Sequence, residues 1–303
     1  MNDFKLWLSA FRLRTLPLSV SGIILGGFLA FYNGFFDLLT FVLAILTTVG
    51  LQILSNLAND YGDGVKGTDN EDRIGPERAI QSGMITPQQM FHAIRINILI
   101  VITLIISTIF IAFGIEYVEY SLIFLVLGGF AVYAAIKYTI GKTAYGYRAL
   151  GDLMVFIFFG LLSVIGSYFL FAKQVDHVVF LPASVIGLLS VAVLNLNNMR
   201  DLTPDKVSGK ITVAVKLGWK KARIYHVTIV SLAMILGILF GVLYYTSPIN
   251  FLFLFAYIPL IKHLIFVFRT DKPKQLDSQL KVVALSTFVL AILLGIGHIY
   301  NAI

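Results

Sequence analysis

The chain has 303 residues, of which 58% are hydrophobic and only 13% are charged, and its mean hydropathy is +0.88. This composition excludes an ordinary soluble protein and is typical of an integral membrane protein. The formal net charge is +7, which by itself could suggest a nucleic-acid partner. The chain contains no cysteine, which excludes disulfides and thiolate metal sites.

An amphipathic segment at residues 3–14 opens the chain and is expected to lie along the membrane surface. Nine apolar stretches follow, each long enough, or nearly so, to cross a hydrocarbon core of roughly 30 Å as a helix. They cover residues 16–34, 37–58, 93–113, 119–136, 150–171, 179–198, 222–245, 250–268 and 282–302. The sequence therefore predicts an all-α, polytopic membrane protein with nine transmembrane helices in a single domain, residues 1–303. The first stretch is expected to be retained as a helix.

The distribution of Lys and Arg predicts the orientation of these helices. If the N-terminus lies in the cytoplasm, 22 of the 23 basic residues fall on the cytoplasmic side, and only Lys173 lies on the other. This distribution follows the positive-inside rule. It predicts a cytoplasmic N-terminus and an outer C-terminus. It also explains the positive charge without a nucleic-acid partner.

Two acidic motifs, residues 56–63 and 197–205, close the second and the sixth apolar stretches. Four helices separate their ends, so both motifs face the cytoplasm. This placement indicates two four-helix repeats plus one further helix around a central cavity. The long loops 61–86 and 200–220 follow the motifs, and we expect them to act as lids or binding loops rather than as plain connectors.

The polar residues of each motif recur at spacings of three or four, which places them on one side of a helix end. They are Asn56, Asn59, Asp60 and Asp63 in the first motif, and Asn197, Asp201 and Asp205 in the second. Carboxylates at membrane depth cost roughly 2.5–3.5 kcal/mol each on insertion scales. Oxygen ligands at helix C-termini suit a hard divalent cation such as Mg²⁺. Asn and Asp could instead merely cap the helix ends, but two matched clusters facing one compartment favour a cation site.

Several cations and tyrosines surround the motifs in cytoplasmic loops. The cations are Arg78, Lys142, Arg148, Arg200 and Lys210. They could clamp a diphosphate, with Lys142 and Lys210 as the strongest candidates, although the positive-inside bias explains any single one. Tyr138 and Tyr147 could line a cavity and stabilise a carbocation through their ring faces, or could belong to an interfacial aromatic belt.

These motifs resemble those of the UbiA-type intramembrane prenyltransferases, and the resemblance covers essentially the whole chain. It includes N-D-x-x-D at 59–63, Y-x-x-x-K at 138–142 and D-x-x-x-D at 201–205. Residues 56–86, with support from 141–152 and 197–218, are most similar to the branch of menaquinone biosynthesis, whose acceptor is 1,4-dihydroxy-2-naphthoate.

Two positions depart from the pattern of the broader family. Gly67 stands where a third aspartate is usual, and Asp69 follows two residues later, a shift that the menaquinone branch shares. The N-terminal Arg-Pro is replaced by Arg12-Leu13, with Arg14 two residues further on. Whether Asp69 binds metal, and which arginine meets the acceptor carboxylate, are left open.

The resemblance implies a Mg²⁺-dependent enzyme that transfers a polyprenyl group from polyprenyl diphosphate to 1,4-dihydroxy-2-naphthoate, with decarboxylation. It implies that the metal ligands are Asn59, Asp60, Asp63, Asp201 and Asp205, and that these aspartates and Lys142 are catalytic. The implied substrate-binding residues are Asn56, Arg14, Arg78, Tyr138, Tyr147, Arg148, Asn197, Asn198 and Lys210.

Two alternative functions are open, one a related enzyme and the other a transporter. A sister prenyltransferase with a 4-hydroxybenzoate or homogentisate acceptor would keep both motifs but differ at residues 66–86 and 141–152. A cation-coupled transporter would carry its acidic residues in mid-helix with Gly or Pro breaks. Here the acidic residues lie at helix ends.

Overall fold

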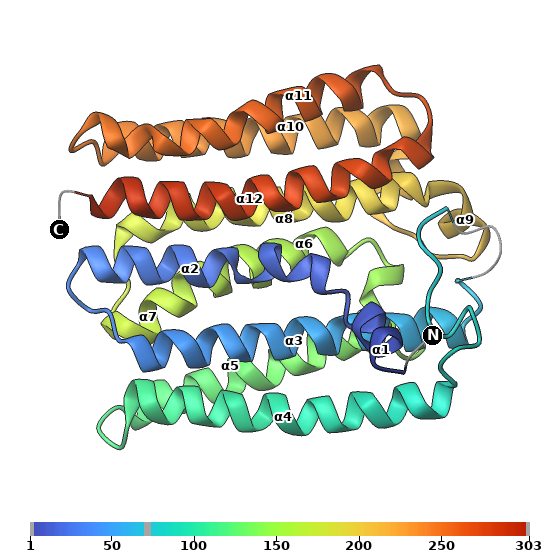
Figure 1. Cartoon of the computed structure of the whole chain (residues 1–303), viewed down its shortest axis with the longest axis horizontal. Helices are drawn as coiled ribbons and strands as arrows, with labels where there is room; N and C mark the ends of the chain where they lie inside the picture. Colours follow the sequence, from blue (N-terminus) through green and yellow to red (C-terminus); the bar gives the residue numbers. More distant parts are fainter. Residues whose placement is uncertain (1–2, 70–73, 301–303) are drawn as a thin grey trace.

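The computed structural model of the chain describes residues 3–69 and 74–300, without the side chains of Asp3 and Phe4. Figure 1 shows a bundle of long, roughly parallel helices, with the N-terminal segment at one end and the C-terminus at the other. Within the described residues, nine segments are long and apolar enough to cross a membrane. The predicted all-α, nine-span architecture is confirmed.

The elements follow one another in two halves. The first half contains α1 (Asp3–Phe11), a 3₁₀ turn (Leu13–Thr15), α2 (Leu16–Tyr32), α3 (Leu38–Val65), α4 (Pro87–Phe113) and α5 (Val118–Lys137). The second contains a 3₁₀ turn (Tyr145–Tyr147), α6 (Gly151–Val155), a π-helix (Phe156–Gly166), α7 (Ser167–Ala172), a 3₁₀ turn (His177–Val179), α8 (Phe180–Arg200), α9 (Leu202–Val207), α10 (Val213–Leu243), a 3₁₀ helix (Pro248–Ala256), α11 (Tyr257–Arg269), a 3₁₀ turn (Pro273–Gln275) and α12 (Leu276–Ile299).

Several helices extend beyond the apolar stretches that predict them, because polar turns continue the helix outside the hydrocarbon core. α3 ends at Val65, seven residues past the predicted end. α4 begins six residues early at Pro87, because Thr86 caps it and accepts a hydrogen bond from the Gln89 amide at 3.2 Å. α10 begins at Val213 and breaks at Gly218, whose φ of 71° lies in the left-handed region.

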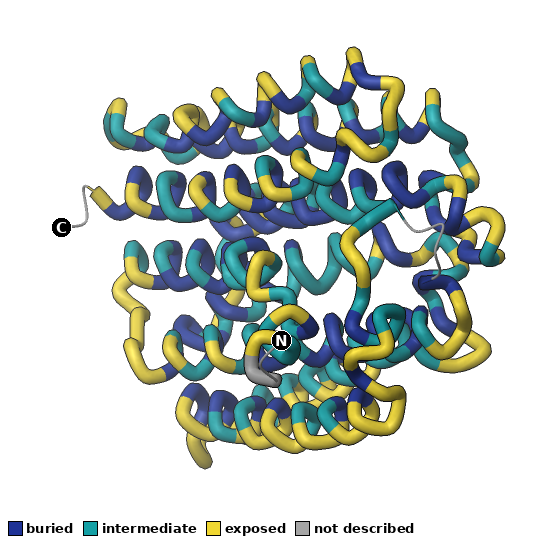
Figure 2. The backbone as a smooth tube through the Cα atoms, turned by 45° about the vertical axis from the view of Figure 1, so that its right-hand side comes forward, coloured by how far each residue is buried: buried dark blue, intermediate teal, exposed yellow. Residues whose placement is uncertain are grey.

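The middle of the bundle is occupied by α12, which packs against both α2 and α8. In the spans that contain α8 and α12, 61% of the residues in the most apolar stretch are buried inside the protein, whereas in the span of α5 only 6% are. Figure 2 shows the same contrast, with exposed positions on the outer helices and buried positions between them. The outer apolar side chains are therefore left for lipid.

Two glycines, Gly160 and Gly26, permit close helix crossings at the π-helix and the adjoining start of α7. A Cβ on Gly160 would lie 2.6 Å from the Cα of Gly187 and 2.7 Å from the carbonyl oxygen of Ala183, both backbone atoms of α8. A Cβ on Gly26 of α2 would lie 2.1 Å from Ser167 Oγ. Such small residues let helices approach closely in lipid, where packing replaces the hydrophobic effect.

α3 and α8, which carry the two acidic motifs, end on the same side of the bundle, next to α1 and α9 (Figure 1). We call this side the motif end. The helix α1 packs on the protein there: Ala10 is buried, and Trp7 and Phe11 pack on a cluster that includes Leu54 and Leu57 of α3. The amphipathic face of the N-terminal segment is therefore covered at least partly by the protein itself.

Candidate active site at the motif end

The last two turns of α3 carry the entire first motif, and they bury its carboxylates. Asp60 is 1% exposed and Asp63 is 2% exposed. Gly62 allows the end of α5 to approach, since a Cβ there would lie 2.4 Å from Thr139 Oγ1. The Thr139 hydroxyl in turn donates to the carbonyl of Ala58 at 2.9 Å. This packing removes the motif from solvent.

Asp63 is the centre of a polar cluster that joins three segments of the chain. Lys210 Nζ donates to Asp63 Oδ2 at 3.2 Å, and Tyr147 Oη donates to Asp63 Oδ1 at 2.8 Å. Thr68 Oγ1 lies 2.6 Å from Tyr147 Oη, and Lys66 Nζ lies 4.0 Å from the centre of the Tyr147 ring. We call Asp63, Lys66, Thr68, Tyr147 and Lys210 the Asp63 cluster.

The protonation states in this cluster follow from burial and from the neighbouring charges. Burial and the Asp63 carboxylate raise the pKa of Tyr147, so the phenol stays protonated and donates to Asp63. Burial alone would lower the pKa of Lys210, but Asp63 and Asp205 outweigh it and raise that pKa. Lys210 is therefore a buried ammonium, and the Lys210 amide also donates to the carbonyl of Asp205 at 2.8 Å.

The second motif does not lie on one uninterrupted helix, and the prediction that its residues share a single helix end needs correction. α8 stops at Arg200, Asp201 has non-helical backbone angles, and Asp205 belongs to the short α9. The spacing of four is nevertheless kept by the hydrogen bond from the Asp205 amide to the carbonyl of Asp201, at 2.9 Å. Loop 200–220 then folds back, so that Lys210 contacts Asp63 of the first motif.

Arg200 organises the carboxylates of this motif. Its Nη2 donates to Asp201 Oδ2 at 2.6 Å and to Asn197 Oδ1 at 2.8 Å, and its Nη1 pairs with Asp277 of α12. The arginine is 1% exposed, so its charge is balanced inside the protein. It is thus engaged within the motif rather than presented to a ligand as a free cation.

Residues 78–80 of the predicted lid after α3 pack on the first motif. The amides of Ala79 and Ile80 donate to the two carboxylate oxygens of Asp60, at 3.2 and 3.4 Å. Arg78 Nε lies 3.6 Å from Asp69 Oδ2. Residues 70–73 of this loop lie outside the described residues.

A polar cavity of about 310 Å³ lies between this loop, the N-terminal segment and α8. Its walls include Arg12, Arg14, Asp60, Glu77, Arg78, Asn197 and Arg200. We call it the arginine pocket. It brings together residues that are far apart in the sequence, among them both N-terminal arginines.

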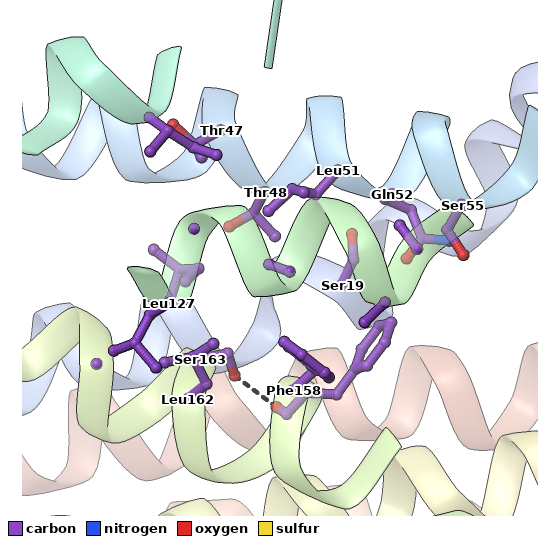
Figure 3. Close-up of a pocket in the computed structure, with 18 of the residues that line it drawn as sticks. Ser19, Thr47, Thr48, Leu51, Gln52, Ser55, Leu127, Phe158, Leu162 and Ser163 are labelled. Carbon is purple, nitrogen blue, oxygen red and sulfur yellow. Dashed lines mark hydrogen bonds between the residues drawn. The ribbon is translucent and has the colours of Figure 1, made fainter. Parts of the chain in front are cut away.

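A second cavity, of about 350 Å³ and mostly apolar, extends from the motif end into the bundle between α2, α3, α4, α5 and the π-helix. Asn56, Asn59 and Tyr138 line its polar end. Figure 3 shows hydroxyl and amide side chains of α3, among them Thr48, Gln52 and Ser55, with Leu127, Phe158 and Leu162 around the same space. The predicted cavity is therefore formed mainly by the first five spans.

Of the four predicted asparagines, Asn197 bonds Arg200, and the other three have different surroundings. Asn56 Nδ2 donates to the carbonyl of Phe11 at 2.9 Å and to Thr15 Oγ1 at 3.2 Å, which fastens the N-terminal segment to α3. Asn59 Oδ1 accepts a longer bond from Thr139, at 3.4 Å. Asn198 is 3% exposed on α8. Their roles in substrate or metal binding stay predictions.

Two of the predicted cations lie at the surface. Lys142 and Arg148 are both exposed, and the backbone of Arg148 pairs with that of Ile211 in an isolated bridge. The bridge brings loop 141–148 beside loop 200–220. The catalytic role of Lys142 stays a prediction.

The oxygen ligands at the motif end fit Mg²⁺. No three carboxylate or imidazole groups of the described residues are close enough to form a metal site by themselves. Mg²⁺ is commonly held by only one or two carboxylates together with substrate phosphates and water. Asp60, Asp63, Asp201 and Asp205 are all buried and offer oxygen ligands of this kind.

Three contributors to the site were not singled out from the sequence: Lys66, Thr68 and Thr139. Lys66 follows Asp63 by three residues, and that spacing on a helix could have identified it. Thr68 and Thr139 carried no comparable signal, because their contacts with Tyr147 and Ala58 span 79 and 81 positions.

The fold and the site together define a polytopic helical membrane protein with a charged site at one end of an apolar cavity. Residues 20–288 match the model of the UbiA prenyltransferase family, and the chain belongs to that family. It is therefore a prenyltransferase-family protein rather than a transporter.

Similar proteins from bacteria cover nearly the full length of the chain. It is 43% identical over 267 residues to the 1,4-dihydroxy-2-naphthoate octaprenyltransferase of Escherichia coli, covering 88% of this chain and 86% of that protein. It is 42% identical over 300 residues to the protein of the same name from Haemophilus influenzae, covering 98% and 96%.

Solved structures share the fold at lower identity. A UbiA homolog from Aeropyrum pernix K1 in the apo state is 15% identical with a TM-score of 0.69, covering 96% of this chain and 99% of that one. A homolog from Archaeoglobus fulgidus bound to GPP and Mg²⁺ is 14% identical with a TM-score of 0.59, covering 94% and 99%.

Replacing Tyr147 by Phe tests the Asp63 cluster. The variant removes the hydroxyl that donates to Asp63 but keeps the ring beneath Lys66. A hydrogen bond to a charged group contributes about 1.5–3 kcal/mol, so we expect prenyl transfer to fall roughly 10- to 100-fold. The measurement is the steady-state rate in lipid, with Tyr133→Phe, an exposed tyrosine of α5, as the control. Equal rates for the two variants would show that the hydroxyl does not position Asp63.

Proposed function

We propose that this protein transfers a polyprenyl group from polyprenyl diphosphate to 1,4-dihydroxy-2-naphthoate with loss of carbon dioxide, giving the quinol of demethylmenaquinone, whose oxidation to demethylmenaquinone is a separate step. The observation that carries the proposal is the buried contact between Asp63 and Lys210, at 3.2 Å. It joins the first acidic motif to the loop that follows the second, beside the polar end of an apolar cavity. The similarity to octaprenyltransferases named for this acceptor supports the choice of substrate.

The diphosphate is placed at the Asp63 cluster. Asn59, Asp60, Asp63, Asp201 and Asp205 would hold Mg²⁺ there, and the bound metal would supply charge neutralisation and Lewis-acid assistance to the leaving oxygen. Lys210 and Lys66 face the same position, with their ammonium groups 5.5 and 4.0 Å from the centre of the Tyr147 ring. These fixed cations stabilise the negative charge that develops on the departing diphosphate.

The prenyl chain is placed in the apolar cavity, with its reactive end at Asn59 and Tyr138. The carbon–oxygen bond to the diphosphate breaks, and the electron pair leaves with the diphosphate. The resulting allylic cation is shielded from bulk water by the bundle, which excludes premature capture by water. The Tyr138 ring at the polar end of the cavity can stabilise the cation through its face.

The acceptor then forms a carbon–carbon bond at the ring carbon that carries its carboxylate. The carboxylate leaves as carbon dioxide, and its bonding electrons restore the aromatic ring. The chain's own contribution is to hold both substrates and keep water out while the cation exists. No protein nucleophile is required by this sequence of steps.

The setting of the enzyme is a bacterial cytoplasmic membrane, with the motif end and the N-terminus in the cytoplasm. The basic residues support this orientation, since all but Lys173 fall in the N-terminal segment or in the loops and adjoining helix ends assigned to one side. The two ends of the described chain lie on opposite sides of the bundle (Figure 1), as an odd number of spans requires.

Prenyl transfer by the purified protein in lipid tests the proposal. We expect product from 1,4-dihydroxy-2-naphthoate and a long-chain polyprenyl diphosphate with Mg²⁺, and much less from 4-hydroxybenzoate offered in parallel. Chelation with EDTA should abolish transfer, and added Mg²⁺ should restore it. Turnover of 4-hydroxybenzoate alone would replace the acceptor but keep the reaction class. Undiminished transfer in EDTA would overturn the metal requirement.

A further inference from the structure

A carboxylate from the last span contacts the second acidic motif. Asp277 lies in the first turn of α12, 77 positions after Arg200, and its Oδ1 accepts a hydrogen bond from Arg200 Nη1. The positive end of the α12 dipole favours a carboxylate at this position. α12 packs against α8, which brings the start of the last span beside the end of the helix that carries the motif (Figure 1). Asp277 belongs to neither motif and has no part in the mechanism proposed above.

The guanidinium of Arg200 is shared between two carboxylates. Its Nε donates to Asp201 Oδ1 at 2.9 Å and its Nη2 donates to Asp201 Oδ2 at 2.6 Å, so one edge of the fork engages both oxygens of Asp201. The remaining terminal nitrogen, Nη1, donates to Asp277. The Arg200 side chain is 1% exposed and the Asp277 side chain is 39% exposed. One buried arginine is thus paired with two carboxylates, and the group as a whole is formally an anion.

The negative charge of this group bears on the binding of a divalent cation. An ionised carboxylate offers about four acceptor positions, so Asp201 can bond Arg200 and still offer a lone pair to Mg²⁺. If Asp201 were the only partner of Arg200, the two charges would cancel, and a cation would be attracted only weakly. Because Asp277 balances the arginine as well, Asp201 keeps negative charge for the metal ion while the guanidinium fixes its orientation.

The helical turn that carries Asp277 is fixed by contacts with neighbouring helices. Leu276 is buried in the largest apolar cluster of the protein. Gln279 Oε1 lies 2.8 Å from His263 Nδ1 of α11, and His263 Nε2 lies 2.7 Å from His226 Nε2 of α10. Both histidines are buried. The start of α12 is therefore tied to α10 and α11, which preorganises the carboxylate of Asp277 beside Arg200.

We propose that Asp277 is a positioning residue of the metal site, which balances Arg200 so that Asp201 keeps the charge and the orientation that Mg²⁺ binding requires. This inference rests on the proposed function, since it takes Asp201 as a metal ligand of that reaction. It does not depend on which aromatic acceptor the enzyme uses. The last span thereby contributes to a site whose metal ligands all come from the two acidic motifs.

The test measures metal binding without turnover. The full-length protein in lipid nanodiscs is titrated with Mn²⁺, whose free form is quantified by electron paramagnetic resonance, in the presence of geranyl thiolodiphosphate as a slowly reacting donor. Asparagine can still accept the bond from Arg200, so Asp277→Asn removes only the charge. We expect this variant to raise the Kd for Mn²⁺ about 5- to 20-fold, less than a fully buried charge would, because Asp277 is partly exposed. Asp277→Glu keeps the charge and should restore most of the affinity. Asp271→Asn is the matched control, since Asp271 pairs with Arg223 at 3.2 Å and is 83% exposed.

Steady-state kinetics and thermal unfolding distinguish positioning from a purely structural role. In Asp277→Asn we expect half-maximal prenyl transfer to require more Mg²⁺, with most of kcat recovered at saturating Mg²⁺ and an unchanged KM for the acceptor. A Kd for Mn²⁺ equal to that of Asp271→Asn would overturn the assignment. So would a loss of kcat that excess Mg²⁺ does not restore, or a lowered unfolding midpoint with an unchanged Kd. If the naphthoate acceptor proved wrong, a Kd raised in Asp277→Asn and restored in Asp277→Glu would still support the positioning role.

Discussion

Asp63→Asn is expected to reduce prenyl transfer at least about 100-fold, the scale on which loss of a preorganised charge-stabilising group acts. Asp63 accepts from both Lys210 and Tyr147, and it is a predicted Mg²⁺ ligand. The amide of asparagine cannot balance the buried ammonium or supply a negative oxygen to the metal. The measurement is the initial rate in lipid at saturating concentrations of both substrates.

Asp37→Asn is the matched control for this substitution. Asp37 caps the opposite end of the same helix, α3, where it accepts from the Thr40 amide at 2.7 Å. Asparagine caps a helix about as well as aspartate, so we expect near-normal activity and stability. The double variant Asp63→Asn/Lys210→Met removes the unpaired buried charge as well. If it folds normally and regains activity, Asp63 serves only to neutralise Lys210 and the proposed catalytic role is wrong.

Gly160→Ala is expected to destabilise the protein by about 1–3 kcal/mol or more, in the range of overpacking substitutions. The new methyl group would lie 2.6 Å from the Cα of Gly187 and 2.7 Å from the carbonyl oxygen of Ala183. Both are backbone atoms, so no side-chain rotation relieves the contact and the π-helix must separate from α8. The measurement is the thermal unfolding midpoint in one detergent, together with the yield of folded protein.

Gly129→Ala provides the comparison within the same chain. Gly129 lies on α5, and a Cβ there meets nothing within 4 Å. Alanine favours a helix over glycine by roughly 1 kcal/mol, so this variant should be as stable as the parent or more so. Equal unfolding midpoints for the two variants would show that the π-helix and α8 lie far enough apart at Gly160 to accommodate a methyl group.

The π-helix also bears on function. Phe158, Phe159, Leu162 and Ser163 of this segment line the apolar cavity. π-Helical segments are rare and are frequent at functional sites. Its close contact with α8 links the wall of the cavity to the helix that carries the second motif. A change in that crossing is therefore expected to alter the cavity as well as the stability.

The architecture of this protein could be predicted from the sequence because its signals are local. Length and apolarity define the nine spans, and the placement of charge within each loop predicts the orientation. The acidic motifs were found for the same reason, since Asp60 and Asp63 share one helix end. The ends of helices were less predictable, because polar turns such as residues 59–65 remain helical when another segment packs on them.

The tertiary structure alone decided which of these residues meet. Asp63 and Lys210 are 147 positions apart, and Tyr147, foreseen as a cavity aromatic, instead bonds Asp63 and lies beneath Lys66. Arg14, Arg78 and Arg200 come from three separate segments yet line one pocket. Such contacts depend on how helices cross and how loops fold back, as the small residues at Gly62 and Gly160 allow. Periodicity and composition describe each segment, whereas the partners of a buried charge are set by the packing of all of them.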